Sequence, residues 1–236
     1  LNNAATGTLQ VKIIPNRYDI IYNENYVDEG VNIVSHGTHT WSHKTVLDYV
    51  PVREGYIFQG WYSDPECESN KVTEIDENVA EHTNLYAKWE AKTGYELTVN
   101  YVEKLTDNLL ETEIKSCTYD DVVTAESLKK DFEGYTYDSA SAESVTIGKG
   151  TNEITLYYTK NSYSYTVNYL EEGSNNVLSA AKNANADFET LVTEEAIAID
   201  GYTVTGDTKK TITNKTENNV INFYYAVDSF GGGEDG

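Results

Sequence analysis

The sequence predicts an α+β chain that is mostly β, built from small modules in tandem. Two observations carry this prediction. Short segments alternate apolar and polar residues, which is the pattern of a strand with one buried face. The same motifs also recur at a fixed spacing, which indicates internal repeats. Hydrophobic residues make up 39% of the chain and 20 tyrosines are spread along it, so packed cores are expected rather than a disordered acidic polymer.

The repeat is clearest in the second half of the chain, where three motifs recur in the same order about 67 residues apart. Thr98-Val-Asn-Tyr101 recurs as Thr166-Val-Asn-Tyr169, Gly134-Tyr135 as Gly201-Tyr202, and Thr155-Leu-Tyr-Tyr158 as Asn222-Phe-Tyr-Tyr225. Because the motifs share one register, they mark the opening, the centre and the end of a unit.

A more divergent unit precedes these two and keeps the same order of motifs. Tyr18-Asp-Ile-Ile-Tyr22 opens it, Gly55-Tyr56 lies at its centre, and Asn84-Leu-Tyr-Ala87 closes it. Its second half is longer by about eight residues than in the other units. We place this insertion in residues 61–70, which are rich in turn formers, and predict a surface loop there.

The repeats divide the chain into five predicted parts. They are an N-terminal leader or extra strand at 1–16, modules at 17–92, 93–160 and 161–228, and a flexible tail at 229–236 that contains three consecutive glycines. Modules of this size bury only a modest fraction of their surface. We therefore expect neighbouring modules to contact one another or to be joined by short stiff connections.

The opening and closing segments of each module are predicted to be half-buried strands, because their apolar residues recur at every second position. The predicted buried faces hold Leu97, Val99 and Tyr101 in the second module and Ile221, Phe223 and Tyr225 in the third.

A short helix is predicted ahead of the central Gly-Tyr pair in the second and third modules. Thr124 is a candidate N-cap, and Ala125, Leu128 and Phe132 follow it at helical spacing. The segment 193–195 (Thr-Glu-Glu) occupies the same place in the third module. In the first module Pro51 would end any helix at this position.

The charge of the chain argues against several classes of partner. It has 17 Lys and Arg against 39 Asp and Glu, a formal net charge of -22. Phosphate backbones and anionic membranes would be repelled, so we predict no nucleic-acid partner. No apolar run reaches the length of a membrane span, so no direct membrane insertion is predicted. Cys67 and Cys117 lack metal-ligand spacing and do not suggest a disulfide framework.

Two sets of motifs resemble known families. Gly55-Tyr-Ile-Phe-Gln-Gly-Trp-Tyr62 together with Asn84-Leu-Tyr-Ala-Lys-Trp89 resembles the Listeria-Bacteroides, or internalin B-type, repeat. The Thr-Val-Asn-Tyr openings, Gly-Tyr centres and Tyr-Tyr endings of the other two modules look like MucBP (mucin-binding protein) domains. Both resemblances imply small β-grasp, ubiquitin-like modules in an elongated array on Gram-positive surface proteins. They also imply an extracellular location, attachment to the cell wall through regions absent from this chain, and no catalysis.

The densest polar cluster holds three of the four histidines, His36, His39 and His43, which could ligate a metal such as zinc. Spacings of three and four converge only on a helix, and the Gly and Thr residues between them disfavour one. A solvated strand or loop is therefore the preferred interpretation, and no metal or cofactor site is predicted. Catalytic residues are not predicted either, because the chain shows no nucleophile beside a positioned histidine and acid.

Two weaker site hypotheses remain open. The loop acids Asp64, Glu66 and Glu68 could hold calcium, although the ligand ladder of a calcium loop is missing. Exposed aromatic rings could stack on sugars. The candidates for stacking are Tyr86, Tyr157 and Tyr224, with Trp41 as an aromatic outside the repeat motifs.

Three hypotheses on function follow. The first is a monomeric, non-enzymatic stalk or adhesin segment that holds another part of a surface protein away from the cell wall. The second is a module that binds mucin glycans or host surface proteins, as the MucBP resemblance implies. The third, a metal-dependent enzyme centred on the three histidines, is disfavoured by their spacing.

Overall fold

The structure is a computed structural model that describes Gly7 and residues 16–229. The predicted leader at 1–16 and tail at 229–236 lie almost wholly outside the described residues. Within the described chain there are two compact units. Unit 1 holds the residues up to Tyr95 together with Ser116–Asp121 and Ile147–Gly150, and unit 2 holds Glu96–Lys115, Val122–Thr146 and the residues from Thr151 onward. The division into three modules therefore stays a prediction.

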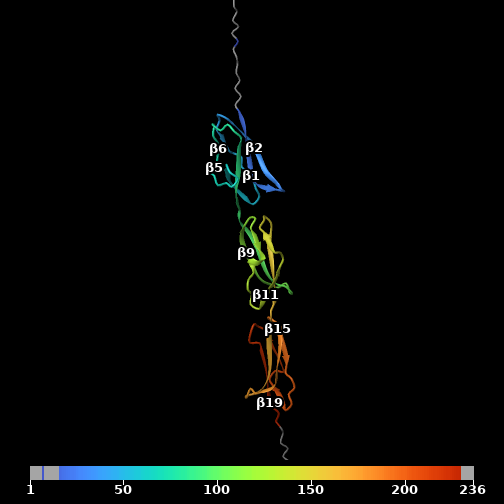
Figure 1. The fold of residues 1–236 in the computed structure, drawn as a ribbon. Coiled ribbons are helices and arrows are strands. Elements are labelled where there is room, and N and C mark those ends of the chain that lie inside the picture. Colours follow the sequence, from blue (N-terminus) through green and yellow to red (C-terminus); the bar gives the residue numbers. More distant parts are fainter. Residues whose placement is uncertain (1–6, 8–15, 230–236) are drawn as a thin grey trace, which may run out of the picture. The chain divides into compact units, whose positions relative to one another are not determined.

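Unit 1 is built on a sheet with the strand order β2-β1-β7-β4-β5. Figure 1 labels β1, β2 and β5 of this sheet. Its strands are β1 Arg17–Asp28, β2 Val31–Thr40, β4 Tyr56–Tyr62, β5 Lys71–Val72 and β7 Thr83–Ala91. The first and last long strands, β1 and β7, pair in parallel, whereas β2 and β4 flank them in antiparallel pairing. A short ladder of β3 Thr45–Val46 and β6 Glu74–Ile75 lies apart from the sheet.

The core of unit 1 follows the alternation in the sequence. Ile20 and Tyr22 of β1 are buried beside Leu85 of β7, and Trp61 of β4 closes the cluster at 2% exposure. The indole Nε1 of Trp61 donates a hydrogen bond to the carbonyl oxygen of Tyr49 at 2.9 Å, so this large ring is buried with its polar group satisfied.

A second sheet has the order β11-β13-β8-β9, and the short strands β10 and β12 pair separately. The strands are β8 Thr93–Glu103, β9 Leu109–Thr118, β10 Val122–Thr124, β11 Tyr135–Ala140, β12 Ser144–Thr146 and β13 Asn152–Lys160. The first and last strands, β8 and β13, again pair in parallel. Leu97, Val99 and Tyr101 are each 0% exposed, which confirms the predicted buried face of this strand.

A third sheet repeats this order as β15-β14-β19-β17, with a separate ladder of β16 and β18. Its strands are β14 Ser162–Glu171, β15 Val177–Asp187, β16 Leu191–Glu195, β17 Tyr202–Thr205, β18 Lys209–Thr213 and β19 Val220–Val227. Strands β14 and β19 are parallel. Ile221, Phe223 and Tyr225 lie in its core, as the alternation predicted.

The predicted helices are wrong in one place and too long in the other. Thr124 caps only a single 3₁₀ turn, Ala125–Leu128, by accepting a hydrogen bond from the Ser127 amide. The segment at Thr193 is not helical, because it forms β16 and pairs with β18. There the hydroxyls of Thr193 and Thr211 lie 3.0 Å apart across the ladder, so cross-strand pairing of β-branched residues outweighs the capping signal. The described chain is therefore nearly all β rather than α+β.

The predicted surface loop of the first unit joins β4 to β5 and is folded rather than extended. Asp64 accepts hydrogen bonds from the amides of Glu68 and Ser69, at 3.0 and 2.9 Å. Cys67 turns inward and is 6% exposed. Among the described residues, no helix is long and apolar enough to cross a membrane.

The buried hydroxyl of Tyr101 is expected to lower the free energy of unfolding at alkaline pH. Burial raises the pKa of Tyr101 to about 12, above the value of about 10 for an unfolded chain. A raised pKa means that this stabilisation is complete below pH of about 10 and is lost as the pH rises through about 12. Unfolding followed by tyrosinate absorbance should show this loss. In Tyr101→Phe the loss should be smaller, and an unchanged pH profile in that variant would contradict the assignment.

Candidate functional site

A candidate site lies where strand β1 is interrupted by a bulge. Its pairing register with β2 shifts between Asn23 and Val27, and Asn25 has a left-handed backbone with φ of 61°. The Asn25 side-chain amide donates to the carbonyl oxygens of Pro65 and Ala87, at 2.8 and 3.3 Å. Asparagine tolerates this conformation better than most residues, so this side chain fixes the bulge to the neighbouring strand and loop.

A buried carboxylate supports the bulge from the inside. Glu24 is 4% exposed and accepts hydrogen bonds from the hydroxyls of Tyr49 and Ser35, at 2.5 and 3.1 Å. Its backbone carbonyl accepts a further bond from the Trp89 indole at 2.6 Å. The hydrogen bond to Glu24 raises the pKa of Tyr49 above its usual value. Because a buried polar network holds its geometry only when its members are partnered, Glu24 makes the shape of β1 rigid here.

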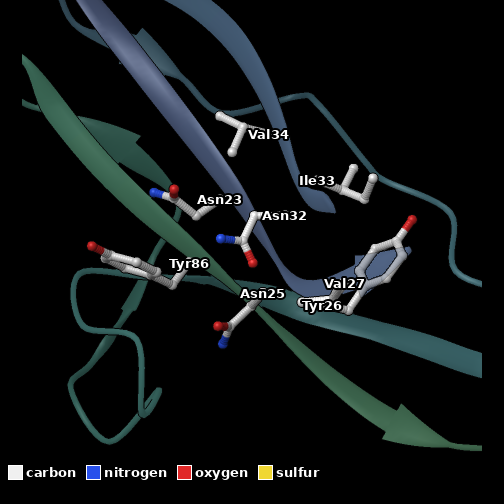
Figure 2. Close-up of a pocket in the computed structure, with 8 residues that line it drawn as sticks. All are labelled: Asn23, Asn25, Tyr26, Val27, Asn32, Ile33, Val34 and Tyr86. Carbon is white, nitrogen blue, oxygen red and sulfur yellow. The ribbon is translucent and has the colours of Figure 1, made fainter. Parts of the chain in front are cut away.

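The bulge opens a pocket of about 330 Å³ between β1, β2 and β7. Figure 2 shows three asparagine side chains lying between the rings of Tyr26 and Tyr86. The pocket is lined by Asn23, Asn25, Tyr26, Val27, Asn32, Ile33, Val34 and Tyr86. Primary amides offer both donors and acceptors, and tyrosine rings combine an apolar face with a polar edge. This combination suits a neutral polyhydroxyl ligand better than a charged one.

Tyr26 is held in place on two sides. The Arg53 guanidinium lies 5.0 Å from the centre of its ring, and the Trp89 ring meets it edge-on at 6.0 Å. A preoriented ring loses little conformational entropy on contact with a ligand. The pocket is therefore largely formed before anything binds.

The comparisons with known families divide the chain into three matched stretches. Residues 18–88 match the Listeria-Bacteroides repeat domain. Residues 96–159 and 165–226 each match the MucBP domain, and these two matches together span more than half of the chain. The chain belongs to the MucBP family. It carries a Listeria-Bacteroides repeat ahead of its two MucBP domains, as the motifs predicted, and is a repeat region of the kind that typifies extracellular surface proteins.

Solved structures that resemble the chain match it only weakly. The crystal structure of Mub-RV is 17% identical with a TM-score of 0.25, and covers 57% of this chain and 100% of its own. The type 2 repeat of the mucus binding protein MUB from Lactobacillus reuteri is 15% identical with a TM-score of 0.24, and covers 56% and 99%. Domains 3-4 of the Streptococcal High Identity Repeats in Tandem are 13% identical with a TM-score of 0.22, and cover 56% and 96%. No curated protein matches the chain.

The three candidate histidines of the Listeria-Bacteroides repeat do not converge. His36 is exposed on β2, whereas His39 is 2% exposed and faces the core. His39 Nε2 lies 2.9 Å from the Glu81 carbonyl oxygen, and Tyr18 stacks on its ring. His43 lies beyond the strand, in the turn. Among the described residues, no group of three or more His, Cys, Asp or Glu side chains is arranged to hold a metal ion.

Among the loop acids of the same repeat, Asp64 accepts hydrogen bonds from within its own loop. Hydrogen bonds from Ser69 and from the backbone amides of Glu68 and Ser69 lower the pKa of Asp64 to about 2. Its carboxylate oxygens serve as a cap for the loop. The geometry therefore does not support the calcium hypothesis for Asp64, Glu66 and Glu68.

The asparagines of the pocket were not foreseen from the sequence. The available signal was the run Tyr22-Asn-Glu-Asn-Tyr26, in which two turn-favouring asparagines interrupt a predicted strand. Alternation assigns Asn23 and Asn25 to one face of a regular strand. It does not reveal the bulge between Asn23 and Val27, or that Asn32 of β2 lines the same pocket. Tyr86, which the sequence offered as a stacking ring, does line the pocket.

Replacing Asn25 tests how the Listeria-Bacteroides repeat builds this site. Asn25→Ala removes two hydrogen bonds to backbone carbonyls. It also places alanine, which adopts the left-handed conformation less readily than asparagine, at this position. Together these changes should lower the free energy of unfolding by about 1–3 kcal/mol. Denaturant unfolding measures this cost. The matched control, Asn32→Ala, changes an exposed asparagine of β2 and should stay within about 0.5 kcal/mol. Equal stability of the two variants would contradict the role of Asn25.

Proposed function

We propose that this chain is a non-catalytic segment of a bacterial cell-surface protein that acts as a stalk or adhesin region. The observation that carries the proposal is the parallel pairing of the first and last strand in each larger sheet. Parallel neighbours run in the same direction, so the chain enters such a repeat at one end and leaves it at the other. Repeats of this kind extend a chain in one direction.

The finer architecture belongs to the same proposal. We expect the modules at 17–92, 93–160 and 161–228 to be β-grasp-like units in which the usual helix is reduced to a turn or replaced by a short ladder. The strand orders of the three larger sheets support this division, since each places its first and last strands side by side at the centre. Attachment to the cell wall stays a prediction.

Charge supports a monomer with separated repeats. The formal charge of -22 is spread over all three matched stretches, and copies of such a chain repel one another at low ionic strength. The ion pairs are mostly exposed, such as Lys44 with Glu74 at 2.7 Å and Lys209 with Glu195 at 3.7 Å, and exposed pairs contribute little to stability. The acidity therefore favours solubility and extension over self-association.

Small-angle scattering tests the stalk. A compact particle of this length has a radius of gyration of about 18 Å. Three modules in a row, each about 35 Å long from strands of about ten residues, give about 30 Å. We expect the larger value, together with the mass of a monomer. A radius near the compact value would overturn the stalk and leave the binding hypothesis standing.

A second candidate function is binding of mucin glycans or host surface proteins, and the pocket of asparagines and tyrosines favours a glycan. The Asn32 amide and the side-chain oxygens of Asn23 and Asn25, whose NH2 groups already donate to backbone carbonyls, can pair with sugar hydroxyls, while Tyr86 offers an apolar ring face. A neutral sugar also avoids the repulsion that an anionic partner would meet. One of the relatives by structure is described as a mucus binding protein, which agrees with this class of ligand.

Retention on immobilised mucin, or on a glycan array, tests this second function. Asn32→Ala should weaken binding about threefold to tenfold, because it removes one side chain that can hydrogen-bond a ligand. The matched control is Asn185→Ala, which changes an exposed asparagine on the edge strand β15, outside the pocket. No retention of the unsubstituted chain, or equal retention of both variants, would remove the glycan hypothesis.

A further inference from the structure

A backbone relay occurs twice in the structure, each time around a Gly-Tyr pair. In unit 1 the Gly55 carbonyl accepts the Lys92 amide at 2.8 Å, and the Lys92 carbonyl accepts the Tyr119 amide at 2.9 Å. In unit 2 Gly134, Asn161 and Phe188 make the same two bonds at 2.8 and 2.9 Å. The relay therefore joins a glycine, a connecting residue and an aromatic residue.

The positions of the three residues are the same in both relays. The glycine immediately precedes the strand that flanks the last strand of its sheet, β4 or β11, and the connecting residue immediately precedes the next first strand, β8 or β14. The aromatic residue immediately follows the second strand, β9 or β15. The aromatic residue thus belongs to the repeat that follows the glycine in the sequence.

The aromatic ring covers the glycine in each relay. A Cβ atom added at Gly55 would overlap the Tyr119 ring, and one added at Gly134 would overlap the Phe188 ring. The rings also meet the tyrosine after the glycine edge-on, at 5.7 Å for Tyr56 and 5.8 Å for Tyr135. The glycine is required twice, by its left-handed φ and by this close approach.

The third Gly-Tyr pair carries only half of the relay. Gly201 has φ of 75°, close to the value at the other two glycines, and its carbonyl accepts the Asp228 amide at 2.9 Å. Among the described residues, however, no atom lies within 4 Å of a Cβ added there. No ring in the described part of the chain therefore covers Gly201 as Tyr119 and Phe188 cover the other two glycines.

The complementary half is present around the first repeat. Trp41 immediately follows the second strand, β2, and its amide donates to the carbonyl of Asn16 at 3.1 Å. Asn16 immediately precedes β1, so it corresponds to the connecting residues Lys92 and Asn161. The Trp41 side chain is 50% exposed, whereas Tyr119 and Phe188 cover a glycine.

We propose that Gly201, Tyr202 and Asp228 form a docking surface for the aromatic residue that follows the second strand of another repeat of this class, placed directly after Asp228 where residues 229–236 stand in this sequence. Trp41 with Asn16 is the matching surface toward a repeat joined before it. The Asp228 carbonyl accepts the amide of the incoming aromatic residue, whose ring then covers Gly201. A sugar or a free aromatic molecule lacks this backbone amide in register. The two occupied relays carry this proposal, which does not depend on the stalk or on glycan binding.

The test is a chain that runs from residue 1 to Asp228 and continues directly with a second copy of residues 162–228. In that register Asp228 takes the place of Asn161, and the copied Phe188 reaches Gly201. By NMR, the Gly201 α-proton signals should shift upfield toward those of Gly134, because a ring now covers them. Amide exchange at the copied Phe188 should slow. Phe188→Tyr in the copy, the ring type of the other relay, should keep both effects, whereas Phe188→Ala in the copy should abolish them.

Gly134 in the same molecule is the internal reference. In the unextended chain, Phe188→Ala should move the Gly134 signals toward those of Gly201. Gly201 signals that are the same with and without the copied ring, while Gly134 keeps its shift, would overturn the proposal. So would a Gly201 shift that appears in the unextended chain on raising its concentration and is lost in Trp41→Ala, because the occupant would then be a second copy.

Discussion

The structure depends on the pairing of the first strand of each larger sheet with its last strand. These two strands lie side by side at the centre of the sheet, run in parallel, and carry the most deeply buried residues. Ile20 and Leu85 pack in the first sheet, Tyr101 and Leu156 are paired in the second, and Val167 and Phe223 pack in the third. The outer strands and the small ladders cover a core that these central pairs define.

This pairing also sets how one repeat can follow another. Because the two central strands are parallel, the chain leaves a repeat at the end opposite to its entry. There it passes the Gly-Tyr pair, whose glycine carbonyl holds the connecting residue by one hydrogen bond. The same connecting residue then receives the amide of an aromatic residue from the following repeat. In the recurring Gly-Tyr motif, the tyrosine thus begins a strand and the glycine carbonyl binds the connecting residue.

The sequence allowed the strands and their buried faces to be predicted, since alternation directly reflects which face is covered. Its motifs, which include the glycines of the Gly-Tyr pairs, also indicated the family. It did not allow the polar pocket to be predicted, because alternation reveals neither the bulge in β1 nor the pairing that places Asn32 of β2 in the same pocket. The segment at Thr193 was misassigned because a capping signal is local, whereas its pairing with Thr211 is not. The role proposed for Trp41 rests on its position after β2, which corresponds to that of Tyr119 after β9 and of Phe188 after β15.

Single-molecule pulling on the second MucBP domain tests the central pairing most directly. Force applied at residues 162 and 227 loads β14 and β19 in shear, because these parallel strands are pulled along their lengths in opposite directions. Force applied at Ser162 and Asp187, which pair across one end of the hairpin, opens β14 and β15 one bond at a time. The account predicts a clearly higher unfolding force in the first geometry. Equal forces, or a lower force in shear, would contradict the central role of the parallel pair.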